Sequence, residues 1–314
     1  THDHEETHLK AIDYLNQSPS QPFFLSVGFF ETHREFPVEH DINPNYCLPP
    51  APLPDTPKTR QDMANYKAMA ATLDDKVGQV LRALDDNDLR DNTLVIYTTD
   101  HGIAFPGMKC HLTDSGIGVS LIMQGLELFR GGQVVDAMVS HIDIFPTLCD
   151  LLNINPPDRL QGTSLMPLVY GEVEAVHEAV FAEVNYHAAY EPKRAVRTSR
   201  YKYIRRYDAR QSPVLPNVDD GLSKDEWLAH GYAYRAPETE QLYDLIFDPN
   251  EANNLASEEK YADVLTEMRT QLNTWMQSTN DPLLVGDVSA PEGAIANDPD
   301  ELSPTITPKP ILKH

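Results

Sequence analysis

An alternation of apolar runs with a long helical pattern constrains the fold of this chain more than any other sequence feature. The runs PFFLSVGFF (residues 22–30) and TLVIYTT (residues 93–99) have the length and nearly continuous apolar character of buried parallel strands. Between them, apolar residues recur at helical spacing over residues 63–84. With a further short strand expected at residues 119–123, this order predicts an α/β fold with a βαβ unit and a mostly parallel central sheet.

The pattern changes beyond Gly171, where shorter strand-like runs follow one another. AVFAEV, RAVRTSRYKYIRRY and QLYDLIFD predict a small antiparallel sheet. A helix with Leu265, Met268, Leu272 and Trp275 on one face is expected to pack on it. The sequence therefore predicts an α/β domain over residues 1–170, a smaller α+β subdomain over residues 171–280, and an extended tail rich in Pro, Asp and Ser over residues 281–314.

Composition excludes some classes of partner. The formal net charge of −23 disfavours general binding to nucleic acid or to an anionic membrane surface, because like charges repel. No window comes near the roughly 18–20 uninterrupted apolar residues that a membrane-spanning helix needs. Cys47, Cys110 and Cys149 are odd in number and widely spaced, which indicates structural cysteines with at most one disulfide.

Polar side chains follow both apolar runs. His33 comes just after the first run, Asp100 and His101 end the second, and Lys109 follows eight residues after His101. In α/β sheets ligands bind beyond the carboxyl ends of the strands, and a carboxylate beside an imidazole could hold a divalent cation. Taken singly, the same residues also fit a turn-capping Asp beside an exposed His, a surface Lys and a loop His.

Longer segments resemble the sulfatase family of the alkaline phosphatase superfamily. PFFLSVGFFETHREF is similar to that family's strand-plus-histidine segment, DNTLVIYTTDHG to its metal-binding strand, and QLYDLIFDPNEANNLA to its carboxyl-terminal signature. The resemblance covers most of the chain and implies an alkaline-phosphatase-like sandwich. It also implies that Asp100 and His101 ligate Ca²⁺, that Lys109 contacts the sulfate, and that His33 hydrogen-bonds or protonates the leaving atom.

A narrower resemblance concerns the branch of the family that acts on N-sulfoglucosamine. TDHGIAFPGMK, VNYHAAYEPKRAVRTSRYKYIRRY and WMQSTNDPLL are most similar to that branch. The resemblance implies a sulfated saccharide as substrate, with His187 and Arg194 as candidate substrate contacts, although His187 could equally lie in an ordinary loop. The seven basic residues over residues 193–206 could form a local anion site or a solvated hairpin face.

Two features of the family are missing from this sequence. The family's nucleophile is a formylglycine made from the Cys or Ser of a C/S-x-P-x-R motif, yet Cys47 is followed by LPPA and Ser18 by PSQP. The paired aspartates that complete the family's calcium site are also missing. The sequence is therefore expected either to begin partway through a sulfatase, with the formylglycine upstream, or to be a degenerate homologue. Retention of Asp100, His33 and Lys109 favours the first, and the 314-residue polypeptide alone is expected to be inactive.

Two other functions remain open. One is hydrolysis of a phosphate or phosphonate monoester by a relative in the same superfamily, since Asp-His-Gly also occurs there. The other is a non-catalytic homologue that binds heparin-like glycans through residues 193–206. Family habit implies export to a periplasm, a lysosome or the cell exterior, and the sequence does not indicate an oligomeric state.

Overall fold

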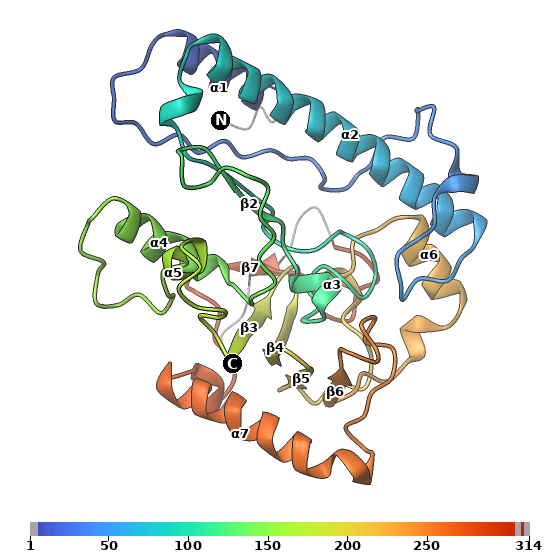
Figure 1. Cartoon of the computed structure of the whole chain (residues 1–314). Coiled ribbons are helices and arrows are strands. Elements are labelled where there is room, and N and C mark those ends of the chain that lie inside the picture. The colour runs from blue at the N-terminus through green and yellow to red at the C-terminus, as the bar shows by residue number, and fades with distance from the viewer. Residues whose placement is uncertain (1–5, 305–308, 311–314) are drawn as a thin grey trace.

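The computed structural model of the chain describes residues 6–304 and 309–310. The long helix α2 lies on one side of the molecule with α1 beside it, and a four-stranded sheet with α7 lies on the opposite side (Figure 1). The α-helices are Thr7–Asn16 (α1), Pro57–Asp86 (α2), Asp114–Ile117 (α3), Ile144–Leu151 (α4), Met166–Val169 (α5), Leu222–Ala229 (α6) and Ala262–Ser278 (α7). The strands are Val95–Thr98 (β1), Leu121–Gln124 (β2), Ala179–Tyr186 (β3), Tyr190–Thr198 (β4), Tyr201–Arg206 (β5), Glu240–Asp244 (β6), Ile295–Ala296 (β7) and Lys309–Pro310 (β8). Short 3₁₀ helices are Pro44–Tyr46 (η1), Arg90–Asn92 (η2), His141–Asp143 (η3), Leu215–Asn217 (η4), Tyr232–Tyr234 (η5), Glu259–Tyr261 (η6) and Pro282–Leu284 (η7).

The mostly parallel central sheet predicted from the sequence is not present among the described residues. β1 pairs with β2 in an antiparallel ladder that places Val95 opposite Gln124, and the connection between these strands contains only the single-turn helix α3. Residues 22–30 belong to no strand. Phe23 and Leu25 pack against the α1–α2 core, while Phe24 is 84% exposed. The prediction was wrong here because an apolar pattern shows which side chains prefer burial, not which backbone a segment pairs with.

Helix α2 forms because its sequence supplies both a start signal and an apolar face. The Thr56 hydroxyl accepts a hydrogen bond from Thr59 N at 3.3 Å, the Thr59 hydroxyl accepts one from Thr56 N at 3.0 Å, and Pro57 occupies the first turn. The predicted helical pattern over residues 63–84 lies entirely within α2 and is confirmed. Near its end α2 packs on α1 through Ala83 and Leu84, and it also contacts α6.

The second half of the chain forms a four-stranded antiparallel sheet in the order β3-β4-β5-β6. Helix α7 packs on one face of this sheet through Leu265, Met268 and Leu272, which contact Val196 and Tyr203 of the central strands. Full burial of each aliphatic side chain of this kind contributes roughly 1.5–3 kcal/mol. The cluster therefore anchors α7 on the sheet.

Residues 281–304 have little regular secondary structure, but they are docked on the sheet rather than extending away from it. Val288 N donates to the Tyr190 hydroxyl at 3.0 Å, and the Tyr186 hydroxyl donates to Val288 O at 3.1 Å. Asn297 N donates to Ala188 O at 2.8 Å. These contacts correct the prediction of an extended tail for this part. The rest of that tail (residues 305–308 and 311–314) and residues 1–5 of the predicted first domain lie outside the described residues.

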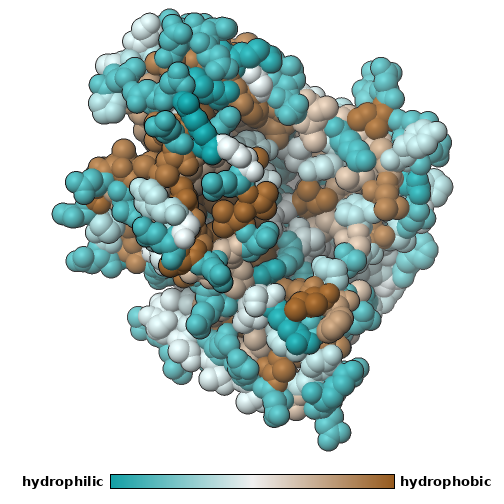
Figure 2. All heavy atoms as spheres, in the orientation of Figure 1, coloured by the Kyte–Doolittle hydropathy of each residue, from teal (hydrophilic) through white to brown (hydrophobic). Residues whose placement is uncertain are grey.

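Cys47, Cys110 and Cys149 are all free thiols. In the part of the chain that the structure describes, no helix is both long and apolar enough to cross a bilayer. Apolar side chains gather over α4 on the face shown in Figure 2. Phe145 of α4 and Leu152, which directly follows this helix, are more than half exposed. Patches of this kind are typical of contact surfaces.

Candidate active site

The buried side chain of Lys109 contacts two residues: His33, which was predicted from the sequence, and Asp219, which was not. Lys109 is 5% exposed, and its Nζ lies 3.4 Å from His33 Nε2 and 3.0 Å from Asp219 Oδ2. His33 Nδ1 is 2.6 Å from the Arg34 carbonyl oxygen. Nδ1 therefore carries the proton, and Nε2 accepts a hydrogen bond from the ammonium. We call His33, Lys109 and Asp219 the lysine site; it brings together the two residues predicted as catalytic.

The loop between β1 and α3 fixes the position of Lys109. Lys109 N donates to Ile103 O at 3.2 Å. The neighbouring Met108 is fully buried in a cluster with Phe105, and Met69 of α2 packs against this cluster. The backbone on this side of Lys109 is therefore anchored in the core, which fixes the point from which its side chain reaches the lysine site.

Asp100 and His101 lie on the same loop. Asp100 is 86% exposed, its Oδ1 accepts a hydrogen bond from His101 N at 3.0 Å, and its Oδ2 lies 3.5 Å from His101 Nε2. His101 Nδ1 is 2.6 Å from the Gly102 carbonyl oxygen, so Nδ1 carries the proton and the Nε2 lone pair faces the carboxylate. Two lone-pair donors facing each other fit one side of a divalent-cation site.

Ca²⁺ takes about six to eight oxygen ligands, and the described residues contain no group of three or more His, Cys, Asp or Glu side chains that could hold a metal. Calcium therefore remains a proposal.

Gly102 lets this loop approach α3 closely. Gly102 N donates to Gly116 O at 2.9 Å, and a Cβ at position 102 would lie 1.9 Å from the Ser115 carbonyl oxygen. We expect Gly102→Ala to lower the free energy of unfolding by about 3 kcal/mol and the melting temperature by roughly 5–10 °C. Gly28→Ala is the matched control, since no atom lies within 4 Å of its added Cβ. Equal melting temperatures for the two variants would contradict this prediction.

His187 reaches the same region from the turn between β3 and β4. Although His187 is exposed at the surface, partial removal of water lowers its pKa, and the positive charge of Lys109 lowers it further. The negative charge of Asp219 raises the pKa of His187, whereas His101 and His33 lower it. His187 thus lies within electrostatic reach of the lysine site and of His101, and its contact with a substrate remains a proposal.

The side chain of Arg194, the other predicted substrate contact, is occupied elsewhere. It is fully buried, with Nε 2.5 Å from Asp281 Oδ2 and Nη2 3.0 Å from Asp281 Oδ1. Nη1 donates to Val184 O at 3.2 Å and to Asn185 Oδ1 at 3.0 Å. Every guanidinium nitrogen has a partner inside the protein. This geometry indicates that Arg194 docks residue 281 on the sheet, and we leave it out of the proposed site.

Several residues of the basic run over residues 193–206 are paired with acidic residues of other segments. Lys202 is fully buried with its Nζ 2.5 Å from Asp114 Oδ1, and Arg197 Nε lies 3.1 Å from the same carboxylate. Arg200 Nη2 lies 2.8 Å from Asp244 Oδ2. Because these three charges are paired within the protein, they do not form the local anion site considered from the sequence. With Lys202 buried, the run is not simply a solvated hairpin face either.

His111 gives the fold a pH-dependent stability. Its Nδ1 lies 3.1 Å from Lys109 O, and burial, followed by the charge of Lys193, lowers its pKa from 6.5 to about 4. The unfolded chain binds this proton more tightly, so the contribution of neutral His111 is present above pH 6.5 and is lost as the pH falls toward 4.

We expect His111→Asn, which keeps an N–H donor, to reduce the loss of unfolding free energy between about pH 7 and about pH 4.5 by roughly 1–2 kcal/mol. Urea unfolding of wild type and variant at both pH values measures this difference. The control is His230→Asn, at a histidine that is exposed on the protein surface. If both variants lose as much stability on acidification as wild type, His111 does not carry the effect.

Asp219 was missed by sequence reasoning. It lies between η4 and α6 within VDDGLS, where acidic residues before a glycine are ordinary turn chemistry. No local signal distinguishes it from Asp220, whose carboxylate pairs instead with Lys224 of α6. Asp219 and Lys109 are 110 positions apart, so only the fold shows which aspartate faces the lysine.

Comparisons with known proteins point to one family. The family model described as Sulfatase matches residues 2–154, and the model described as N-sulphoglucosamine sulphohydrolase, C-terminal, matches residues 108–225. N-sulphoglucosamine sulphohydrolase of Homo sapiens is 30% identical over 96% of this chain and 69% of that protein. An ulvan-active sulfatase of Formosa agariphila is 28% identical over 90% of this chain and 55% of that protein. The solved structure of a 2-O GAG sulfatase matches with a TM-score of 0.67 at 24% identity, over 91% of this chain and 65% of that one. The chain thus spans 55–69% of the length of these proteins.

Proposed function

The chain belongs to the sulfatase family, and we propose that it serves in the hydrolysis of a sulfuric ester or sulfamate on a sulfated saccharide, with N-sulfoglucosamine as the favoured unit. The observation that carries this proposal is the lysine site, in which a buried ammonium contacts an imidazole within electrostatic reach of His187. The match of residues 108–225 to the N-sulphoglucosamine sulphohydrolase model supports the sulfamate.

In this proposal the lysine site holds the sulfuryl group. A sulfate ester or sulfamate carries negative charge that must be stabilised while the bond to sulfur breaks. The ammonium of Lys109, already removed from water and held by Asp219, would donate to a sulfuryl oxygen. His33 would hydrogen-bond the leaving atom or, once protonated, give it a proton. His187 would contact the saccharide.

Two further groups belong to the proposal. Asp100 and His101 would hold one side of a Ca²⁺ ion, and such an ion, when bound, supplies positive charge to the sulfuryl oxygens. The formylglycine nucleophile is expected from outside these 314 residues, because no C/S-x-P-x-R motif occurs within them. The chain's own residues would therefore bind and orient the substrate and handle the proton of the leaving atom.

The two alternative functions have less support. The carboxyl-terminal family model that matches residues 108–225 favours sulfate chemistry over phosphate or phosphonate chemistry. Glycan binding without catalysis was expected to use the basic run over residues 193–206, yet Arg197 and Lys202 of that run are paired with Asp114.

The proposed function is tested by turnover in the full-length gene product, made together with formylglycine-generating activity. We expect release of sulfate from N-sulfoglucosamine, loss of most of this activity on chelation, and recovery on addition of Ca²⁺. Release of phosphate from a phosphate monoester without release of sulfate would contradict the proposal. Binding of a heparin fragment with no turnover would favour the non-catalytic alternative.

A further inference from the structure

Asp219 places a negative charge beside the group that is proposed to hold an anion. Its Oδ2 lies 3.0 Å from Lys109 Nζ, and its side chain is 16% exposed. Within the described part of the chain, Asp219 Oδ1 has no hydrogen-bond donor. A carboxylate so close to a bound sulfuryl group repels it, which weakens binding unless the carboxylate also makes a favourable contact. Oδ1 is available for such a contact.

The loop that carries Asp219 is held by buried contacts of its own. Asn217 is buried, and its Nδ2 donates to Glu191 Oε2 at 3.0 Å. From the other side, Lys224 Nζ donates to Val218 O at 2.8 Å. The two residues that precede Asp219 are therefore fixed by contacts that do not involve its carboxylate.

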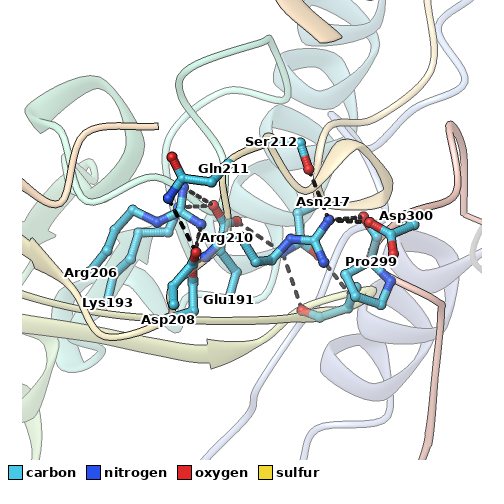
Figure 3. A network of polar contacts seen from close by, with 12 residues as sticks. Glu191, Lys193, Arg206, Asp208, Arg210, Gln211, Ser212, Asn217, Pro299 and Asp300 are labelled. Atoms are coloured by element: carbon cyan, nitrogen blue, oxygen red, sulfur yellow. Dashed lines mark hydrogen bonds and ion pairs between the residues drawn. The ribbon is translucent and has the colours of Figure 1, made fainter. Parts of the chain in front are cut away.

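Asn217 and Glu191, whose hydrogen bond holds this loop, belong to a wider polar network (Figure 3). Lys193 Nζ and Arg206 Nη1 lie 3.0 and 3.4 Å from Glu191 Oε1. These residues lie on β4 and β5, so Asn217 is tied to the central strands of the sheet. A change in the carboxylate of Asp219 should therefore leave the loop in place.

Sulfamates and sulfate esters differ in the atom that leaves when the bond to sulfur breaks. A sulfamate leaves through a nitrogen that bears an N–H, whereas a sulfate ester leaves through an oxygen that has only lone pairs. A carboxylate accepts a hydrogen bond from the nitrogen and repels the oxygen. Lys109 Nζ contacts both His33 Nε2 and Asp219 Oδ2, so a substrate held by Lys109 and His33 lies beside the lysine that Asp219 contacts.

We propose that Asp219 selects sulfamates over O-sulfates by accepting a hydrogen bond from the leaving nitrogen, an inference that rests on the proposed function. In this step the S–N bond would break, its electron pair would stay on the nitrogen, and the sulfuryl group would pass to the hydroxyl of the formylglycine expected from outside these 314 residues. The proton of that hydroxyl would go to solvent, and the sulfuryl group would then be released as sulfate. The nitrogen takes one proton from protonated His33 and a second from solvent, and leaves as an ammonium. Asp219 then faces a cation and stabilises the product.

The test compares two substrates with matched leaving groups, 4-nitrophenyl sulfate and N-sulfo-4-nitroaniline, in the full-length enzyme that bears formylglycine. We expect Asp219→Asn to lower kcat/KM for the sulfamate relative to the ester by about 10- to 100-fold, because a charge-assisted hydrogen bond is lost. Asp220→Asn is the matched control, since Asp220 contacts Lys224 and Ser303 rather than Lys109. An equal loss of kcat/KM for both substrates would show that Asp219 only positions Lys109, and would overturn the inference.

A binding measurement separates failure of this inference from failure of the proposed function. If the wild-type enzyme hydrolyses neither substrate, the proposed function fails, and calorimetry with glucosamine and N-acetylglucosamine still decides the role of Asp219. Tighter binding of glucosamine by wild type, with the preference lost in Asp219→Asn and kept in Asp220→Asn, would support recognition of the amine. No preference in wild type would overturn it.

Discussion

Replacement of Arg194 by Met is expected to lower the free energy of unfolding by about 3–5 kcal/mol, because it leaves a buried carboxylate without its cation. Arg194 is fully buried, and the side chain of its partner Asp281 is 2% exposed. Among the described residues, the donor that remains to Asp281 is Leu283 N, 2.9 Å from Oδ1. Thermal unfolding followed by circular dichroism should show a fall in melting temperature of about 10 °C.

Two further variants show whether the loss comes from the unpaired charge. The double variant Arg194→Met, Asp281→Leu should recover at least half of the lost stability, because no unpaired charge remains. Arg130→Met removes the partner of the exposed Asp91 and should change stability by less than about 0.5 kcal/mol. If Arg194→Met melts like wild type but raises KM for a sulfated saccharide in the full-length enzyme, Arg194 is a substrate contact after all.

Helices α2 and α7 and most of the antiparallel strands could be predicted because their signals are local. The apolar pattern over residues 63–84 predicts one helix, and Thr56 followed by Pro57 indicates where that helix begins. Strands β3, β4 and β5 are separated by short turns, so each pairs with its neighbour in the sequence, whereas β6 pairs with β5 after a longer connection that contains α6. For α2 and for β3 to β5, the information needed lies within a few residues of the element itself.

The pairing of residues 22–30 could not be predicted, because the choice of a partner strand is not local. A nearly continuous apolar run is typical of a strand covered on both faces, yet here Phe23 packs on helices and Phe24 faces solvent. An apolar pattern predicts that side chains are buried, but not that the backbone pairs with another strand. A ladder also needs the N–H and C=O groups of another strand in register, and no described strand supplies them to this segment.

The same limit applies to the charged residues of the candidate site. Family resemblance identified His33 and Lys109, which the structure brings within 3.4 Å of each other. It could not show that Asp219, 110 positions beyond Lys109, is the counter-charge, or that Arg194 is paired with Asp281, 87 positions away. A run of basic residues has the same pattern on a surface and in a core, and only the positions of its acidic partners distinguish the two.

Replacement of Lys109 by Met is expected to lower kcat/KM of the full-length enzyme for N-sulfoglucosamine by about 10²–10³-fold, the usual effect of removing one preorganised donor from a developing negative charge. The methionine side chain fills similar space in the core cluster beside Met108 but cannot donate to a sulfuryl oxygen. Steady-state kinetics with sulfate release as the readout measures the change. Lys260→Met, at an exposed lysine, is the control and should keep wild-type kinetics.

Loss of activity in Lys109→Met could also come from the charge that Asp219 keeps when its partner is removed. The double variant Lys109→Met, Asp219→Asn separates the two effects, because it carries neither the cation nor the unpaired carboxylate. We expect its melting temperature to return toward that of wild type while kcat/KM stays low. Recovery of turnover together with stability would contradict a direct contact between Lys109 and the sulfuryl group, because the lysine would then serve only to neutralise Asp219.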